Sequence, residues 1–333
     1  MVKAIALLSG GLDSLLAVEL IHKQGIDITA LHFTTPFCQC DNRKEGCKSS
    51  ISVISEKLGL KVKTINNTAE FLKIIVKPKH GYGKNMNPCI DCRILMLKTA
   101  SEYMKETGAS FLFTGEVLGQ RPMSQHRQSL ERIEKESGLT GLILRPLSAK
   151  WLEETIPEKE GWVNRSKLLG FTGRSRKDQM NLAKLFEIKD YPCPAGGCLL
   201  TDPAFCARLK DLMKYSSLSI SEIILLKTGR HFRIDEKTKL IVGRNEKEND
   251  LLLTCEKEGD IIIDMTDCPG PAAILRGQTD EANIMLGSRI TARYADSNGK
   301  PLTAYLKAKG QTLRTLEIKP LDKDRIKSYS IGK

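Results

Sequence analysis

The sequence lacks the features of a membrane or secreted protein. None of its apolar runs approaches the roughly 20 residues that a membrane-spanning helix needs. The first residues go straight into a strand-length apolar run, without the basic segment and cleavage site of a secretory signal. Internal repeats and low-complexity tracts are also missing, and a hydrophobic content of 41% over 333 residues is typical of globular domains. We therefore expect a cytoplasmic protein with no membrane segment.

Positive charge and cysteine are both abundant. A formal net charge of +12 favours a polyanionic partner, because lysine and arginine that neutralise phosphates release counterions. Ten cysteines in a cytoplasmic chain favour metal or sulfur chemistry over disulfides.

Strands and helices alternate in the first half of the chain. After the first apolar run we expect strands at 28–33, 61–66 and 110–116, with helices at 49–60 and 92–109. This alternation predicts an α/β fold with a mainly parallel sheet, helices on both faces and ligands at the carboxyl ends of the strands.

The pattern changes near residue 205. One helix and several short strand-like pieces follow, among them HFRI, KLIVG, DIIID, AAILRG and RITARYA. We therefore expect two domains, residues 1–205 and a smaller α+β module at 206–333.

Between the first apolar run and the first helix the chain reads SGGLDS, residues 9–14. Glycines there let the backbone approach a bound group, and the N–H groups of a helix start favour an anion such as phosphate. The lysine of a Walker loop is missing. The stretch resembles the PP-loop of the ATP pyrophosphatases, which split ATP to AMP and pyrophosphate while adenylating a substrate.

Two cysteine motifs lie about a hundred residues apart. Cys89 and Cys92 form a CxxC pair at a helix start, where the helix terminus and Arg93 favour thiolate, and Cys193 and Cys198 lie in CPAGGC. These sulfurs can hold zinc or an iron–sulfur cluster, or can accept and pass on sulfur, and the residues alone leave the three options open. A further trio has no assigned role: Cys38, Cys40 and Cys47.

The order SGGLDS, NPCIDC, TGE, basic helix and CPAGGC resembles that of the tRNA 2-thiouridylases and related tRNA sulfurtransferases, over roughly residues 1–205. The resemblance implies that Cys89, Cys92 and Cys198 either ligate a 4Fe-4S cluster or shuttle a persulfide, and cysteine at all three positions favours the cluster. The C-terminal part departs from the β-barrels of the standard thiouridylase. It resembles the RNA-binding module of NFACT proteins, through GRHFRI, KLIVGRNEKEN and PGPAAILRG.

The resemblance implies an enzyme that adenylates a uridine carbonyl of tRNA with ATP and Mg²⁺ and then replaces the oxygen with sulfur from sulfide or a persulfide carrier. Asp13 would help hold magnesium and, with Cys89, Cys92 and Cys198, would carry the chemistry. The residues expected to bind the nucleotide are Ser9, Gly10, Gly11, Asp13, Ser14, Phe33, Thr114 and Gly115.

Basic residues near the cysteine motifs are expected to contact the RNA backbone. They are Lys77, Lys79, Lys84, Arg121, Arg174, Arg176 and Lys177. Tyr82, between glycines, is a candidate to stack on a flipped base.

Two other hypotheses stay open. One is a PP-loop ligase that forms an amide or nitrile on a small molecule, with structural zinc at the CxxC pair. The other is a non-catalytic RNA-binding protein on a nucleotide-binding scaffold, which the intact SGGLDS motif disfavours.

Overall fold

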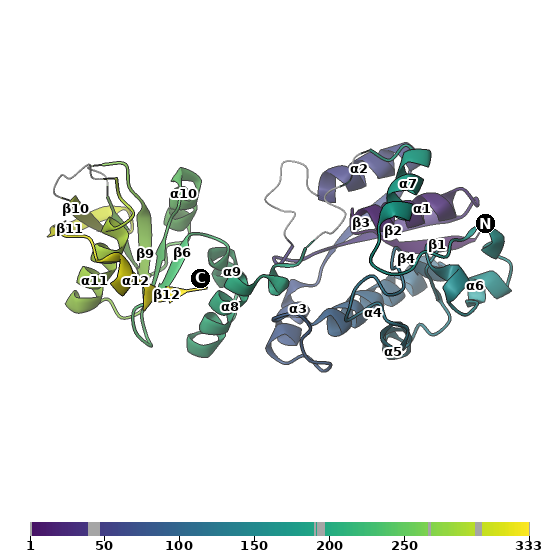
Figure 1. Cartoon of the computed structure of the whole chain (residues 1–333), viewed down its shortest axis with the longest axis horizontal. Helices are drawn as coiled ribbons and strands as arrows, with labels where there is room; N and C mark the ends of the chain where they lie inside the picture. The colour runs from purple at the N-terminus through teal and green to yellow at the C-terminus, as the bar shows by residue number, and fades with distance from the viewer. Residues whose placement is uncertain are drawn as a thin grey trace. The chain divides into compact units, whose positions relative to one another are not determined.

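The computed structural model divides the chain into two compact units, Met1–Thr201 and Asp202–Lys333 (Figure 1). The structure describes residues 2–38, 47–189, 191, 197–265, 268–296 and 302–332, without the side chains of 47–50. The boundary between the units follows Thr201, a few residues before the expected position. None of the described helices is long and apolar enough to cross a membrane.

The first unit is built on a parallel sheet. Its strand order is β3-β2-β1-β4-β5 and every neighbouring pair is parallel. The strands are β1 (Lys3–Leu7), β2 (Asp27–Thr34), β3 (Lys61–Asn66), β4 (Phe111–Thr114) and β5 (Ile143–Leu144). The predicted fold class is confirmed for this unit.

Side chains alternate between two apolar layers along β1. Ala4 and Ala6 pack with residues of α1 (Leu12–His22) and α2 (Cys47–Leu58), whereas Ile5 and Leu7 pack with α4 (Cys89–Thr107) and α5 (Arg127–Ser137). Because helices cover both faces of the sheet, residues 4–7 of β1 and 111–113 of β4 are apolar and buried (Figure 1). The unit also contains α3 (Thr68–Val76), α6 (Ile156–Lys159), α7 (Lys177–Leu185) and the short 3-10 helices η2 (Ala149–Trp151), η3 (Arg165–Lys167) and η4 (Leu199–Thr201).

The register of the central strands decides where the site lies. Leu7, the last residue of β1, pairs with Thr114, the last residue of β4. The chain after β1 therefore emerges beside the chain after β4, at the carboxyl edge where ligands of such sheets bind.

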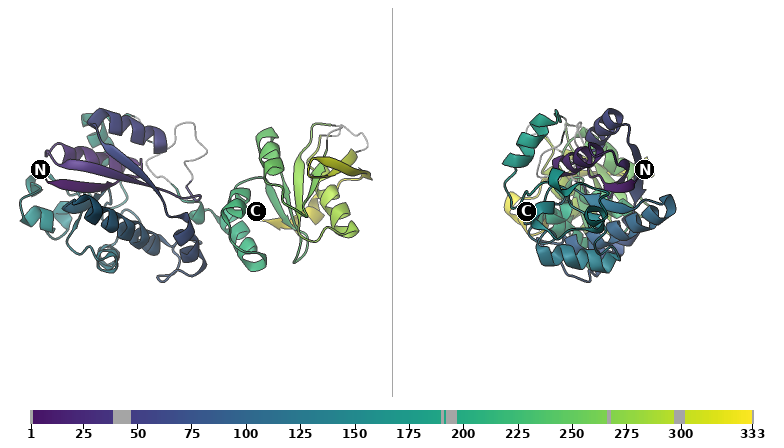
Figure 2. Two further views of the ribbon diagram at one scale, coloured as in Figure 1. Left: turned by 180° about the vertical axis from the view of Figure 1, so that it is seen from behind. Right: turned by 90° about the vertical axis from the view of Figure 1, so that its right-hand side faces the viewer.

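The second unit is a sheet with helices (Figure 2). Its strand order is β11-β10-β8-β9-β7-β6-β12, and every neighbouring pair is antiparallel. The strands are β6 (Arg230–Arg233), β7 (Lys239–Val242), β8 (Ile261–Asp264), β9 (Ala272–Arg276), β10 (Leu302–Ala308), β11 (Gln311–Ile318) and β12 (Ser330–Ile331). The expected smaller α+β module is confirmed as a fold.

Helices contribute to two apolar clusters of this unit. Side chains of α11 (Glu281–Ala292) and α12 (Lys323–Lys327) join one, and those of α9 (Ile220–Leu226) and α10 (Glu246–Thr254) join the other. The helix α8 (Pro203–Tyr215) opens the unit. One expectation is wrong, because RITARYA is not a strand: its first residues form the last turn of α11.

Candidate functional site

The SGGLDS stretch forms a tight loop between β1 and α1. Gly10 has a φ of 74°, which favours glycine, and Gly11 is the N-cap of α1. The Ser14 hydroxyl donates to the Gly11 carbonyl at 2.8 Å, and the two oxygens Ser9 Oγ and Ser14 Oγ lie 3.2 Å apart. The loop thus places hydroxyls and the free N–H groups of a helix start together, which is an environment for phosphate.

Gly115 lets the chain after β4 touch this loop. A Cβ atom at Gly115 would lie 2.5 Å from the backbone of Asp13 and of Ser14. Backbone at that distance cannot give way as a flexible side chain can, so only glycine permits the contact. The expected nucleotide residues Thr114 and Gly115 are therefore in place beside the phosphate loop.

The Asp13 side chain is the centre of a polar network. Gln120 Nε2 donates to Asp13 Oδ2 at 2.6 Å, Arg176 Nη1 lies 3.3 Å from the same oxygen, and Gln179 Nε2 donates to Gln120 Oε1 at 3.1 Å. Burial raises the pKa of Asp13, against the Gln120 hydrogen bond and the charges of Arg176 and Arg121. Within the part of the chain that the structure describes, the buried Asp13 Oδ1 has no hydrogen-bond partner. That oxygen is therefore available to a cation.

Glu116 ties the CxxC helix to the end of β4. Its buried carboxylate lies 3.3 Å from Arg93 Nε, 3.2 Å from Arg145 Nε and 3.1 Å from the Thr114 hydroxyl. Burial would raise the pKa of Glu116, but the Arg93 and Arg145 guanidiniums outweigh it and hold the pKa below its usual value. The ion pairs fix the start of α4 against the nucleotide edge.

Three chain segments bring the cysteines together. Cys198 pairs through its backbone with Cys38, and the N–H of Met86, just before the CxxC helix, donates to the Leu200 carbonyl at 3.1 Å. The thiols of Cys38, Cys89 and Cys92 all act electrostatically on Cys198. The expected set Cys89, Cys92 and Cys198 is thus one group of neighbouring sulfurs, with Cys38 added.

Burial makes these sulfurs weakly acidic. It raises the pKa of Cys198 to about 12, helped by the other thiols, and the pKa of Cys92 to about 11 despite the Arg93 charge. Burial also raises the pKa of Cys89, although Arg121 and Arg93 oppose it. At neutral pH the three are thiols unless a metal takes the place of their protons.

The geometry of a metal centre is not formed by these side chains. Among the described residues, no three His, Cys, Asp or Glu side chains are arranged to hold a metal ion. The Cys40 and Cys193 residues and the side chain of Cys47 lie outside the described part of the chain.

The residues expected to contact RNA fall into two groups. Lys77, Lys84, Arg174 and Lys177 are exposed, and Lys79 forms an exposed ion pair of 2.7 Å with Glu136. Arg121 is also exposed and acts electrostatically on Asp13 and Cys89, whereas the half-buried Arg176 reaches Asp13.

Two aromatic residues, Phe33 and Tyr82, were also expected to contact ligands. Phe33 is half-buried near the end of β2, while the neighbouring His32 Nδ1 lies 3.1 Å from the Leu8 carbonyl. The Tyr82 ring is exposed, but its hydroxyl donates to the Ile75 carbonyl. This bond anchors the candidate stacking residue to α3.

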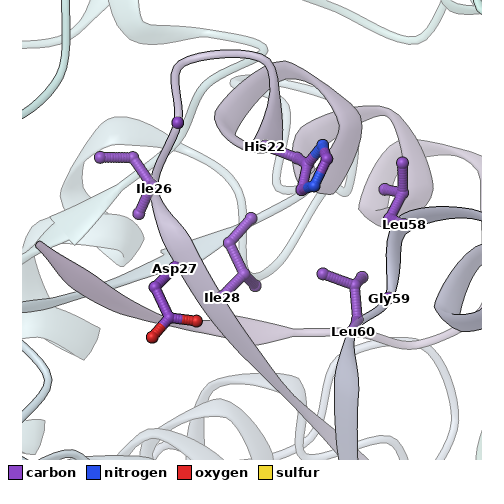
Figure 3. Close-up of a pocket in the computed structure, with 8 residues that line it drawn as sticks. His22, Ile26, Asp27, Ile28, Leu58, Gly59 and Leu60 are labelled. Atoms are coloured by element: carbon purple, nitrogen blue, oxygen red, sulfur yellow. The ribbon is translucent and has the colours of Figure 1, made fainter. Parts of the chain in front are cut away.

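A cavity of about 320 Å³ lies at the opposite edge of the sheet, where β2 and β3 begin. His22 and Asp27 lie on opposite sides of Ile28 in it, with Leu58 and Leu60 beside them (Figure 3). It lies away from the carboxyl edge that holds the phosphate loop, so we do not assign it to the site.

Sequence reasoning did not single out several residues of the site. Gln120 and Gln179 hold Asp13, and Glu116 and Arg145 fix the start of α4. The position of Glu116 and Gln120 directly after β4, in TGEVLGQ, could have indicated these two residues. Arg145 and Gln179 come from distant segments, and no local pattern indicates them.

Comparison with known proteins finds one family match in each unit of the chain. Residues 1–157 match the family "Thiamine biosynthesis protein (ThiI)", and residues 229–330 match "NFACT protein RNA binding domain". A probable tRNA sulfurtransferase of Lysinibacillus sphaericus is 32% identical over 145 residues, which are 44% of this chain and 34% of that protein. One from Thermococcus kodakarensis is 32% identical over 164 residues, 46% of this chain and 39% of that protein.

Among solved structures, a 4-thiouridine synthetase in complex with RNA and ATP is 22% identical to this chain, with a TM-score of 0.37. The superposed region covers 68% of this chain and 52% of the synthetase chain. The chain spans little more than a third of the length of the two curated relatives, 34% and 39%. The matches confirm the expected resemblance for each unit. Residues 1–157 are therefore similar to the thiamine biosynthesis protein (ThiI) family, and residues 229–330 are similar to the NFACT RNA-binding-domain family.

Proposed function

We propose that this chain is an ATP-dependent tRNA sulfurtransferase that converts a uridine to a thiouridine. The observation that carries the proposal is that Glu116, next to the Gly115 that touches the Asp13 backbone, lies 3.3 Å from Arg93 of the CxxC helix, so the SGGLDS loop and that helix start come from neighbouring segments. An anion-binding loop beside a group of buried sulfurs suits a reaction that consumes ATP and transfers sulfur. The curated relatives named as probable tRNA sulfurtransferases support the same reaction.

The phosphate loop would serve the activation step. A uridine carbonyl oxygen attacks the α-phosphorus of ATP, pyrophosphate leaves, and the oxygen becomes part of a better leaving group, AMP. Ser9, Ser14 and the N–H groups at the start of α1 would bind the phosphates, and Asp13 Oδ1 would hold Mg²⁺. Sulfide then attacks the ring carbon, and AMP leaves with the former carbonyl oxygen.

The sulfur group fits an iron–sulfur centre by its chemistry. Thiols with a pKa raised to about 11 and 12 are poor nucleophiles at neutral pH, which disfavours a persulfide shuttle through Cys92 and Cys198. A metal that displaces the thiol protons also offsets the cost of burying thiolate charge. We propose that Cys89, Cys92 and Cys198 hold a 4Fe-4S cluster, which when bound supplies a place for inorganic sulfide.

The second unit would bind the tRNA. Its match to an RNA-binding-domain family and the net charge of +12 support this role, and the exposed cations Lys77, Lys84, Arg174 and Lys177 would add contacts from the first unit. A cytoplasmic location, where tRNA and ATP are present, is part of the same proposal.

The proposal is tested by the AMP formed from ATP and Mg²⁺, with and without unmodified tRNA and sulfide. We expect AMP only when tRNA is present. AMP formed equally without tRNA would favour a small-molecule ligase, and tRNA binding without any AMP would favour a non-catalytic RNA-binding protein.

A further inference from the structure

Two arginines that the sequence groups with RNA contacts lie at the phosphate loop. Arg176 Nη1 is 3.3 Å from Asp13 Oδ2, and its side chain is 18% exposed. Arg121 follows Gln120, which donates to the same carboxylate oxygen at 2.6 Å. The loop that carries Arg121 is held by backbone hydrogen bonds from Gly119 to Gln125 at 2.7 Å and from Gln125 to Arg121 at 3.2 Å.

The charges at this point do not balance. Arg93 and Arg176 both act electrostatically on Arg121, and Arg93 is paired with Glu116, a carboxylate that also pairs with Arg145. Arg176 shares Asp13 with Gln120, and the Arg121 side chain has no ion pair or hydrogen bond within the described residues. Two guanidiniums thus face a single carboxylate, which leaves an excess of positive charge for an anion.

The segment before α7 has two chemically different sides. Arg174 and Lys177 are exposed, whereas Arg176 is half-buried and Gln179 is buried in the Asp13 network. A surface that binds an RNA backbone needs cations open to solvent. Arg174 and Lys177 meet that requirement, and the inward Arg176 does not.

We propose that Arg121 and Arg176 form a phosphate-binding subsite for the nucleotide, beside the SGGLDS loop, and that the inward Arg176 does not contact RNA. The inference rests on the proposed use of ATP. Guanidinium groups bind phosphate oxygens through two parallel N–H bonds, and their charge persists at neutral pH. With the Mg²⁺-bound triphosphate in place, Asp13 would hold the metal, and Arg176 would pair with a phosphate instead of the Asp13 carboxylate.

The test measures the Kd of Mg²⁺-ATP and of inorganic pyrophosphate for the full chain, without RNA. We expect Arg121→Gln and Arg176→Gln to weaken both by about tenfold, since a charge-assisted hydrogen bond contributes that much. Arg176→Lys, which keeps the charge, is expected to lose less. The tRNA Kd of Arg176→Gln should stay within about twofold of wild type.

Arg132→Gln is the matched control, because it removes one exposed charge from α5. It should bind ATP as wild type does. Arg121→Gln and Arg176→Gln proteins that bind ATP normally, or a wild-type chain that binds neither ATP nor pyrophosphate, would overturn the inference. Normal ATP binding without thiouridine formation would instead count against the proposed function alone.

Discussion

Asp13 combines two requirements that oppose each other. Its carboxylate is buried enough to raise its pKa, yet Gln120 and the Arg176 and Arg121 charges stabilise the ionised form. The same burial makes the residue sensitive to loss of its charge.

Replacing Asp13 with asparagine tests this directly. Asp13→Asn keeps the size of the side chain but removes the charge that would hold Mg²⁺, so ATP consumption should fall by about 100-fold or more. The measurement is AMP formation at saturating Mg²⁺ and tRNA, with circular dichroism to verify the fold. Turnover close to wild type would remove Asp13 from the mechanism.

Gly115 is a position where an added Cβ atom would collide with neighbouring backbone. Gly115→Ala places a Cβ 2.5 Å from the Asp13 and Ser14 backbone, so β4 and the phosphate loop must move apart. We expect a loss of about 1 to 3 kcal/mol in the free energy of unfolding and a clear loss of ATP affinity.

Gly108→Ala is the control for backbone strain. Gly108 has a φ of +66° at the end of α4, with open space around its Cβ position. Its substitution should lower stability by about 1 kcal/mol and leave ATP affinity unchanged. Equal effects of the two substitutions on ATP affinity would show that the close contact at Gly115 is not needed.

Glu116 joins the end of β4 to α4 through Arg93 and to the segment after β5 through Arg145. Glu116→Gln leaves the Arg93 guanidinium without a counter-charge and Arg145 with Glu134 alone, which should cost about 3 kcal/mol in the free energy of unfolding. The folded-state pKa of Glu116 lies below its usual value of 4.5, so its contribution is complete above pH 4.5 and is lost as the pH falls through the lower folded-state value.

Denaturation of the wild type and of Glu116→Gln across pH measures this contribution. The difference in the free energy of unfolding should be largest above pH 4.5 and should shrink on acidification. A difference that stays constant with pH would mean that the ionised Glu116 does not support these elements.

The sulfur group depends on the segment around Cys198 lying between residues 37–38 and 85–86. If Cys198 is a cluster ligand, Cys198→Ser should lower the iron and acid-labile sulfide of anaerobically purified protein together with thiouridine formation. Cys255→Ser, a cysteine of the other unit, should change neither. Iron content unchanged in Cys198→Ser would exclude Cys198 as a ligand.

Local patterns predicted most elements of the first unit because each of them has a strong periodicity of its own. β2, β3 and α4 lie within a few residues of the expected ranges, and the SGGLDS loop lies between β1 and α1 as expected. The Asp13 network was not predictable, since Gln120, Arg176 and Gln179 meet only after the sheet has formed. Charge alone also failed to separate the exposed Arg174 from the inward Arg176.

The two units have separate apolar clusters and separate family matches. Because each has its own core, a chain ending at Thr201 should fold and bind ATP with unchanged affinity. The tRNA affinity of this shorter chain should fall. The slope of its tRNA affinity against salt concentration should become shallower, because the shorter chain neutralises fewer tRNA phosphates. Titration of tRNA at several salt concentrations measures both, and an unchanged slope would assign the second unit to another partner.

The central claim is that the whole chain moves sulfur onto tRNA at the expense of ATP. The most direct measurement is mass spectrometry of nucleosides from unmodified tRNA after anaerobic incubation with iron-loaded protein, ATP, Mg²⁺ and isotopically labelled sulfide. We predict labelled thiouridine that requires ATP and is lost in Asp13→Asn. Absence of thiouridine from tRNA incubated with folded, iron-loaded protein would contradict the claim.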